Sequence, residues 1–251
     1  MPAKTKDNSK RTLVLASTSR YRRTLLQRLG VPFDVVAPNI DETPRGNETP
    51  SATAVRLAEA KARAVAAHLS RALVIGSDQV ADLDGAPVGK PGNHERAVAQ
   101  LRALSGRTVV FHTGVALVRC RQRPLPEAFW SDVASTFRRL SDVEIDAYLR
   151  RETPYDCAGA VKSEGLGIAL FERIATDDPT ALIGLPLIAV VEPLRAGRRV
   201  GSSRCERHTL RGTQSARRGA AMATCCPSGR WTLRAVFGIG SSRRRNRHAH
   251  S

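Results

Sequence analysis

The sequence predicts a protein of the α/β class. Between Thr12 and Leu194, short apolar runs typical of buried strands alternate with amphipathic stretches of helical period, and this alternation is the pattern of α/β folds. The composition, 41% hydrophobic over 251 residues, supplies enough apolar side chains for a buried core. We therefore expect a globular protein with strands and helices in turn along the chain.

The N-terminal half is expected to hold three strands and two helices. The strands are short apolar runs bounded by polar residues, at 12–16, 33–37 and 72–76. The first helix, 21–29, follows the polar turn Ser17-Thr18-Ser19 and is stopped by Gly30. The second, 51–69, is rich in alanine and has its apolar residues in helical register.

The C-terminal half continues the alternation. Helices are expected at 94–104, at 141–151 and at 187–194. The middle one opens with a capping box, Ser141-x-x-Glu144. Strands are expected at 108–118, 133–138 and 161–171. The last of these contains Gly165 and Gly167 inside an apolar run, which favours a strand with a close backbone approach.

Charge and residue composition divide the chain into three parts. Residues 1–10 are a polar extension, 11–195 the predicted folded domain and 196–251 an arginine-rich extension predicted to be disordered. From Arg195 onward there are 14 Arg, no Lys and one acid, Glu206, so this segment carries +13 of the net charge of +17. The near balance of the remainder argues against a chain devoted to nucleic-acid binding. The alternative for the tail is sequence-blind contact with RNA or another acidic surface.

Cysteine spacing and hydropathy bear on location. The five cysteines, at 120, 157, 205, 225 and 226, show no metal-binding or disulfide pattern, and we expect free thiols. No apolar run approaches the roughly 18 residues that would cross a bilayer, and the N-terminus shows no signal-peptide core. The cytoplasm is the expected location.

Asp78 is the strongest candidate for chemistry. Ser77-Asp78-Gln79 follows the apolar run 72–76, and ligands of open α/β sheets lie beyond the carboxyl ends of such strands. The alternative is that Asp78 caps a turn. Before helix 51–69, Asp41 and Glu42 could join Asp78 at a hard divalent cation such as Mg²⁺, or form an ordinary exposed turn.

Basic residues provide a second constellation. The turn that begins at Ser17 leaves backbone N–H groups free at a helix start, where an anion is favoured, and Arg22 and Arg23 follow one turn later. Lys61, Lys90 and Lys162 stand out because the chain's basic residues are mostly Arg. Taken singly, the hydroxyl residues read equally well as helix caps, and each lysine as a solvated surface group.

Seven blocks together resemble the Maf family of nucleotide pyrophosphatases, in the family's order and over Leu13 to Leu194. The blocks are Leu15-Ala16-Ser17-Thr18-Ser19-x-x-Arg22-Arg23, Asp41-Glu42, Leu57-Ala58-x-x-Lys61-Ala62, Gly76-Ser77-Asp78-Gln79, Gly89-Lys90-Pro91, Lys162-Ser163-Glu164-Gly165 and Gly184-Leu185-Pro186. The resemblance implies a two-lobed curved mixed sheet flanked by helices, as in inosine triphosphatase. It also implies hydrolysis of a nucleoside triphosphate to its monophosphate and pyrophosphate with a divalent metal, whether Mg²⁺, Mn²⁺ or Co²⁺.

The resemblance also implies residue roles. Asp78 takes the place of the proton acceptor, Glu42 and Asp78 of metal-binding acids, and four residues of phosphate contacts: Ser17, Arg22, Lys61 and Lys90. The positions that separate subfamilies are Tyr21, Gln79 and Glu164, and here they resemble the branch that acts on 7-methyl-GTP rather than on dTTP and UTP. Methylation at N7 makes guanine cationic, which suits an aromatic face and a carboxylate.

Two residues depart from that branch, which usually has Trp at the position of Tyr21 and Pro at that of Arg20. The Arg20 side chain could contact phosphate or face water, and we expect it to face water. Two hypotheses stand beside the enzyme: an inert nucleotide-sensing module attached to RNA through the basic tail, and a chain that binds nucleic acid throughout. The expected partner is a small nucleotide and no membrane; nucleic acid would bind only through the tail, and a homodimer is left open.

Overall fold

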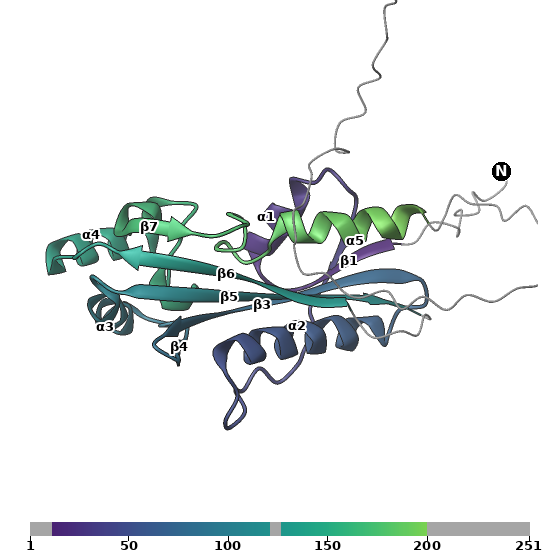
Figure 1. Cartoon of the computed structure of the whole chain (residues 1–251), viewed down its shortest axis with the longest axis horizontal. Helices are drawn as coiled ribbons and strands as arrows, with labels where there is room; N and C mark the ends of the chain where they lie inside the picture. Colours follow the sequence, from purple (N-terminus) through teal and green to yellow (C-terminus); the bar gives the residue numbers. More distant parts are fainter. Residues whose placement is uncertain (1–11, 121–126, 200–251) are drawn as a thin grey trace, which may run out of the picture. The chain divides into compact units, whose positions relative to one another are not determined.

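A seven-stranded mixed sheet forms the centre of the protein in the computed structural model, which describes residues 12–120 and 127–199 (Figure 1). The strand order is β2-β1-β3-β5-β6-β7, and β4 pairs with β3 off this path. The strands are β1 (Thr12–Ala16), β2 (Asp34–Val36), β3 (Ala72–Leu83), β4 (Ala86–Val88), β5 (Thr108–Arg119), β6 (Glu127–Phe137) and β7 (Phe171–Ala175). The α/β class is confirmed.

Five α-helices flank this sheet in the described part of the chain. They are α1 (Arg20–Gln27), α2 (Pro50–Ala66), α3 (His94–Leu104), α4 (Asp142–Glu152) and α5 (Leu187–Arg199). Each corresponds to a predicted helix, and the bounds of α3 are the predicted ones. The capping box at the start of α4 is confirmed, because Ser141 Oγ accepts from the backbone N–H of Glu144 while the Glu144 side chain accepts from the backbone N–H of Ser141.

The pairing partners of β3 change where β1 ends. β1 runs parallel to β2 and to β3, and its last pair with β3 joins Ala16 to Gly76. Beyond Gly76, β3 continues for seven residues in antiparallel pairing with β5 alone on the main path, with β4 joining from Ala81. In this part of β3, beyond the end of β1, Asp78, Gln79 and Val80 line a cleft.

Helices cover both faces of the sheet at the β1 end. Alternate side chains of β1, β3 and β5 point to opposite faces. On one face Leu15 and Ile75 pack with α1 and α5, and on the other Val14 and Val74 pack with α2. Figure 1 shows α1 and α5 on one side of the strands and α2 on the other. This three-layered region is the first lobe.

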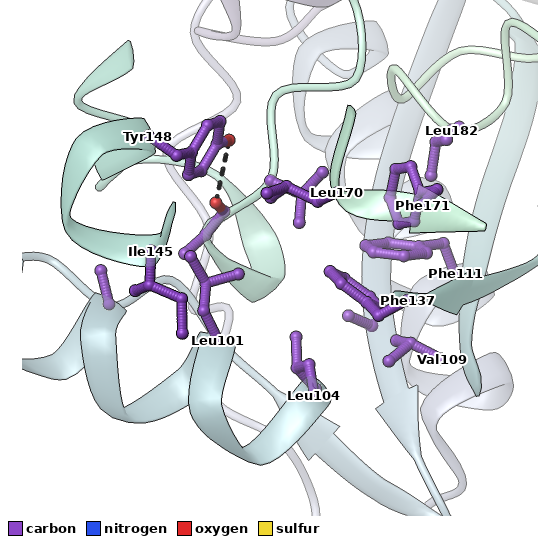
Figure 2. Packing of buried hydrophobic residues seen from close by; sticks show 14 of the residues in the cluster. Leu101, Leu104, Val109, Phe111, Phe137, Ile145, Tyr148, Leu170, Phe171 and Leu182 are labelled. Atoms are coloured by element: carbon purple, nitrogen blue, oxygen red, sulfur yellow. Dashed lines mark hydrogen bonds between the residues drawn. The ribbon is translucent and has the colours of Figure 1, made fainter. Parts of the chain in front are cut away.

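A second lobe surrounds the far ends of β3, β5 and β6. There α3 and α4 pack against aromatic residues of the strands (Figure 2). Phe137 and Phe171 meet edge to face with ring centroids 4.8 Å apart, and the buried Tyr148 hydroxyl donates to the carbonyl of Ala160. The predicted two-lobed arrangement on one mixed sheet is thereby confirmed.

Two predictions about individual elements need correction. The strand that begins at Ala72 does not end at Gly76 but runs to Leu83, so that Asp78 lies inside β3. The segment 161–171 is not a strand; it forms a turn and a 3₁₀ helix, Leu166–Leu170. Its glycine does permit close backbone approach, since a Cβ at Gly167 would lie 2.5 Å from the carbonyl oxygen of Lys162.

Some expectations fall on residues that the structure does not describe. The extension 1–10, nearly all of the arginine-rich extension 196–251 and Cys205, Cys225 and Cys226 lie outside the described residues. Within the described ranges, Cys120 and Cys157 are free thiols, as expected. Within the same ranges, no helix is both long and apolar enough to span a membrane.

Gly76 lets α2 lie directly on the sheet, and substitution of Gly76 by alanine is expected to weaken the fold. An added Cβ would overlap the backbone carbonyl of Ala58 and the backbone nitrogen of Ala62 on α2. Overpacking of this kind costs about 1–3 kcal/mol, which denaturant unfolding at equilibrium would measure. At Gly46, where a Cβ meets nothing within 4 Å, alanine should change stability by no more than about 0.5 kcal/mol. Equal stability of the two variants would contradict the close packing of α2.

Candidate active site

A cleft of about 820 Å³ opens between the two lobes beside β3. It is bounded by the turn after β1, the loop before α2, the first half of β3 beyond Gly76, and the segments 87–90 and 153–164. All nine residues predicted for the site line it: Ser17, Tyr21, Arg22, Glu42, Lys61, Asp78, Gln79, Lys90 and Glu164. The structure thus brings together residues from six separate stretches of the sequence.

The turn after β1 forms one wall of the cleft. Ser17 is buried, and its Oγ accepts from the backbone N–H of Ser19, 3.1 Å away. Ser19 is the N-cap of α1, since its side chain accepts from the backbone N–H of Arg22. The turn is therefore held by its own hydroxyl groups at the start of α1, where the helix macrodipole favours an anion.

Arg22 crosses from α1 to the loop before α5. Its Nε donates to the carbonyl of Gly184 at 2.8 Å, and Ser77 Oγ donates to the same oxygen at 3.0 Å. Burial lowers the pKa of the Arg22 guanidinium below its ordinary value, and the charges of Asp78 and Glu42 act in the opposite direction. Arg23, its neighbour in the sequence, does not line the cleft.

The centre of the site is a chain of three charges. Lys61 Nζ lies 2.6 Å from Asp78 Oδ1 and 2.8 Å from Glu42 Oε1. The Lys61 and Asp78 side chains are 6% and 11% exposed, whereas Glu42 is 53% exposed. Lys61 reaches Asp78 because α2 packs on Gly76 and on Gly114, the residue opposite Asp78 in β5.

The loop that carries Glu42 is anchored to α2. Arg56 donates from Nε and Nη2 to the two carboxylate oxygens of Glu48 and from Nη2 to the carbonyl of Thr43. Burial acts to raise the pKa of Glu42, but the hydrogen bond and charge of Lys61, with Lys90 and Arg22, lower it below its ordinary value. Asp41 turns away from the cleft and accepts from Thr43.

Lys90 lies in a loop fixed at both sides. The carbonyl of Gly89 accepts from the Gln100 side chain at 3.0 Å and from the backbone N–H of Gly159 at 3.3 Å. The backbone N–H of Gly92 donates to the carbonyl of Tyr155. Lys90 is thereby held at the cleft between α3 and the segment that follows α4.

Tyr21 and Glu164 line the cleft near Cys157. Burial raises the pKa of Tyr21 above its ordinary value. Glu164 lies in a turn that the Glu152 side chain stabilises. Glu152 accepts hydrogen bonds from Lys162 Nζ and from the backbone N–H of Leu166, both at 2.8 Å. Lys162 is therefore a support of this turn and does not line the cleft.

Gln79 is held by the protein itself. Its Nε2 donates to Thr113 Oγ1 at 3.0 Å and to the carbonyls of Ala181 and Leu182 at 2.9 and 3.1 Å. Side chains alternate along a strand, so Gln79 leaves β3 on the face opposite to Asp78. At the cleft Gln79 thus fixes the loop 181–182 that forms part of the wall.

Sequence reasoning did not single out several lining residues, among them Glu48, Tyr155, Asp156 and Cys157. Asp156 and Cys157 both reach the Tyr21 hydroxyl, at 3.4 and 3.6 Å. Burial raises the pKa of the Cys157 thiol to about 11. The segment Pro154-Tyr155-Asp156-Cys157 has no apolar period, which indicates a loop but does not by itself predict that the loop borders a site.

Glu42 and Asp78, the two acids predicted to bind a divalent cation, both line the cleft and both contact Lys61. Within the described ranges no group of three or more His, Cys, Asp or Glu side chains has the geometry to hold a metal ion. A pair of carboxylates is nevertheless the donor set with which Mg²⁺ is usually held, the remaining positions being taken by phosphate oxygens and water. The donors present therefore fit a metal shared with a phosphorylated ligand.

The fold and cleft define an α/β protein with a charged, ligand-sized site between two lobes, and the comparisons identify its family. The model of the family described as Maf-like protein matches residues 12–197. The 7-methyl-GTP pyrophosphatase of Polaromonas sp. is 61% identical over 186 residues, which cover 74% of this chain and 84% of that protein. The 7-methyl-GTP pyrophosphatase of Burkholderia thailandensis is 61% identical over 189 residues, covering 73% and 86%. The chain belongs to the Maf family.

Among solved structures, the Staphylococcus aureus Ham1 protein is similar at 16% identity and a TM-score of 0.44, covering 75% of this chain and 100% of that one. Family membership rests on the sequence comparisons alone.

Proposed function

We propose that this protein hydrolyses 7-methyl-GTP to 7-methyl-GMP and pyrophosphate. The observation that carries the proposal is the polarity of the cleft. The cations Arg22, Lys61 and Lys90 lie around Glu42 and Asp78, the basic end of the cleft, whereas Tyr21 and Glu164 lie near Cys157, the head-group end. Such a cleft suits a ligand with an anionic tail and a cationic aromatic head. The names of the relatives support this choice of substrate.

The basic end binds the triphosphate. The Ser17 turn supplies a helix start, and the three cations offset the charge of the phosphate groups. Two contacts within the site support this role, because an ion pair with Asp78 holds Lys61 and a hydrogen bond to the carbonyl of Gly184 holds Arg22 before any ligand binds. Preorganised cations stabilise developing charge without reorganisation during the reaction.

Asp78 acts as the general base. It accepts a proton from a water molecule whose oxygen attacks the α-phosphorus; the bond from that phosphorus to the bridging oxygen breaks, and pyrophosphate leaves with the bonding electron pair. Lys61 orients the Asp78 carboxylate and remains positively charged next to the phosphates. Two of the three subfamily positions, Tyr21 and Glu164, act at the base. Tyr21 stacks on the base, and Glu164 pairs with the positive charge of the base or accepts hydrogen bonds from its N–H donors.

Glu42 and Asp78 would hold a divalent cation, Mg²⁺, Mn²⁺ or Co²⁺, together with the phosphate oxygens. Such an ion supplies charge neutralisation and lowers the pKa of a bound water. Lys61 already engages one oxygen of each carboxylate. Glu42 is the more exposed of the two acids and is kept ionised by Lys61, Lys90 and Arg22.

The proposal is tested by pyrophosphate release from 7-methyl-GTP, GTP, dTTP and UTP, each with Mg²⁺, Mn²⁺ or Co²⁺ and with EDTA. We expect the highest kcat/KM with 7-methyl-GTP and loss of release with EDTA. Preference for dTTP or UTP would assign the chain to the other branch. If the protein bound nucleotides but released pyrophosphate from none of them, its function would be that of a nucleotide-binding module.

The expected location of this activity is the cytoplasm.

A further inference from the structure

Arg20 makes contacts at the head-group end of the cleft that a solvent-facing residue would not make. Its guanidinium carbon lies 4.8 Å from the centroid of the Tyr21 ring, and Nη2 donates to the Tyr21 hydroxyl at 2.7 Å. The same nitrogen is 3.8 Å from Asp156 Oδ2. The expectation that Arg20 faces water is thus only partly correct: its side chain is 69% exposed, yet it covers the ring and pairs with an acid.

These contacts use the chemistry that a methylated guanine would need. A guanidinium and a 7-methylguanine ring are both planar, delocalised cations. Each gains from an aromatic face and from a nearby carboxylate. Tyr21 and Asp156 offer both groups to Arg20, and all three residues line the cleft.

We propose that Arg20 is a specificity-determining residue that competes with a cationic nucleobase for Tyr21 and Asp156. The proposal rests on the proposed function, because it concerns the base end of the same cleft. Arg20 occupies the positions next to Tyr21 and Asp156 that a cationic base would take, and it therefore raises KM for nucleotides with cationic bases. A neutral base gains less from displacing Arg20. The high exposure of Arg20 allows it to swing into solvent when a base enters.

The test compares Arg20→Ala with Arg23→Ala. Both substitutions remove one exposed arginine from α1, and Arg23 lies outside the cleft. Removal of an exposed cation–π competitor is expected to lower KM for 7-methyl-GTP about two- to fivefold. The KM for GTP should stay the same or rise, and kcat should stay the same for both nucleotides. Arg23→Ala should leave both KM values at the wild-type level.

A Tyr21→Leu background locates the effect. Without the Tyr21 ring, Arg20 and the base no longer compete for an aromatic face. In the Tyr21→Leu background, Arg20→Ala should therefore change the KM for 7-methyl-GTP by less than twofold. An undiminished gain would mean that Arg20 acts by simple charge repulsion and would overturn the competition. The proposal would equally be overturned if Arg20→Ala left the ratio of the two kcat/KM values unchanged or shifted it toward GTP.

Binding of the products keeps the test independent of turnover. Calorimetric titration with 7-methyl-GMP and with GMP should show tighter binding of the methylated nucleotide alone in Arg20→Ala. If the wild-type protein released no pyrophosphate but this difference appeared, the proposed reaction would be wrong and the role of Arg20 would stand. If turnover occurred and the difference did not appear, the role of Arg20 would be wrong and the reaction would stand.

Discussion

Replacement of Asp78 by asparagine is expected to lower kcat for pyrophosphate release by about a hundredfold to ten-thousandfold, the contribution of a positioned general base. Asparagine keeps the size of the side chain but accepts a proton poorly. Because Asp78 lies within β3 and is nearly buried, the backbone around it should not move. The KM for the nucleotide should change much less than kcat, and steady-state kinetics would measure both.

Asp177→Asn is the matched control for this prediction. Asp177 is exposed and does not line the cleft, so its substitution should leave kcat at the wild-type value. Near-wild-type turnover by Asp78→Asn, with the protein folded, would show that another group takes the proton. Glu42, the other acid on Lys61, would then be the next residue to substitute.

Replacement of Lys61 by methionine is expected to destabilise the protein and inactivate it together. Methionine retains the packing of the side chain but leaves the carboxylate of Asp78 in a nearly buried position without its ion-pair partner. Removal of one partner from a buried pair costs about 3–5 kcal/mol, which would appear in the free energy of unfolding from denaturant titration. The loss of a phosphate-binding cation should also lower kcat/KM by more than tenfold.

A double variant separates the two effects of Lys61. In Lys61→Met with Asp78→Asn, both charges are absent, so most of the lost stability should return while activity stays low. Arg63→Met is the control, because Arg63 lies on the same helix, is 53% exposed and pairs with Glu59; its effect should stay within about 0.5 kcal/mol. Strictly additive effects of the Lys61 and Asp78 substitutions would contradict a direct ion pair.

Period and capping residues were sufficient to predict most of the fold. The helices α1 to α4 begin at Ser, Thr or Asn caps, at Ser19, Thr49, Asn93 and Ser141, which are residue types that local sequence reveals. The predicted end of β3 was wrong because the strand becomes polar where it borders the cleft. Ser77, Asp78 and Gln79 interrupt the apolar run of β3, so the strand seemed to end there, although these residues continue to pair with β5. The hairpin of β3 and β4 was missed despite Asp84-Gly85, a strong turn signal.

The site was predictable as a set of residues and not as an arrangement. The order of the blocks placed Lys61 and Asp78 in one site by resemblance. That Lys61 bridges two acids depends on the approach of α2 to Gly76 and Gly114, which no local pattern encodes. The supports Glu48 and Glu152 were missed for the same reason, since their partners come into reach only in the folded chain.

The most direct test of the account is hydrolysis of 7-methyl-GTP in water enriched in ¹⁸O, with mass spectrometry of both products. Attack of a water on the α-phosphorus predicts one ¹⁸O atom in 7-methyl-GMP and none in pyrophosphate. Label in pyrophosphate, or release of inorganic phosphate from the intact triphosphate, would mean that water attacks elsewhere and would contradict the arrangement of Asp78 and the three cations proposed for this cleft.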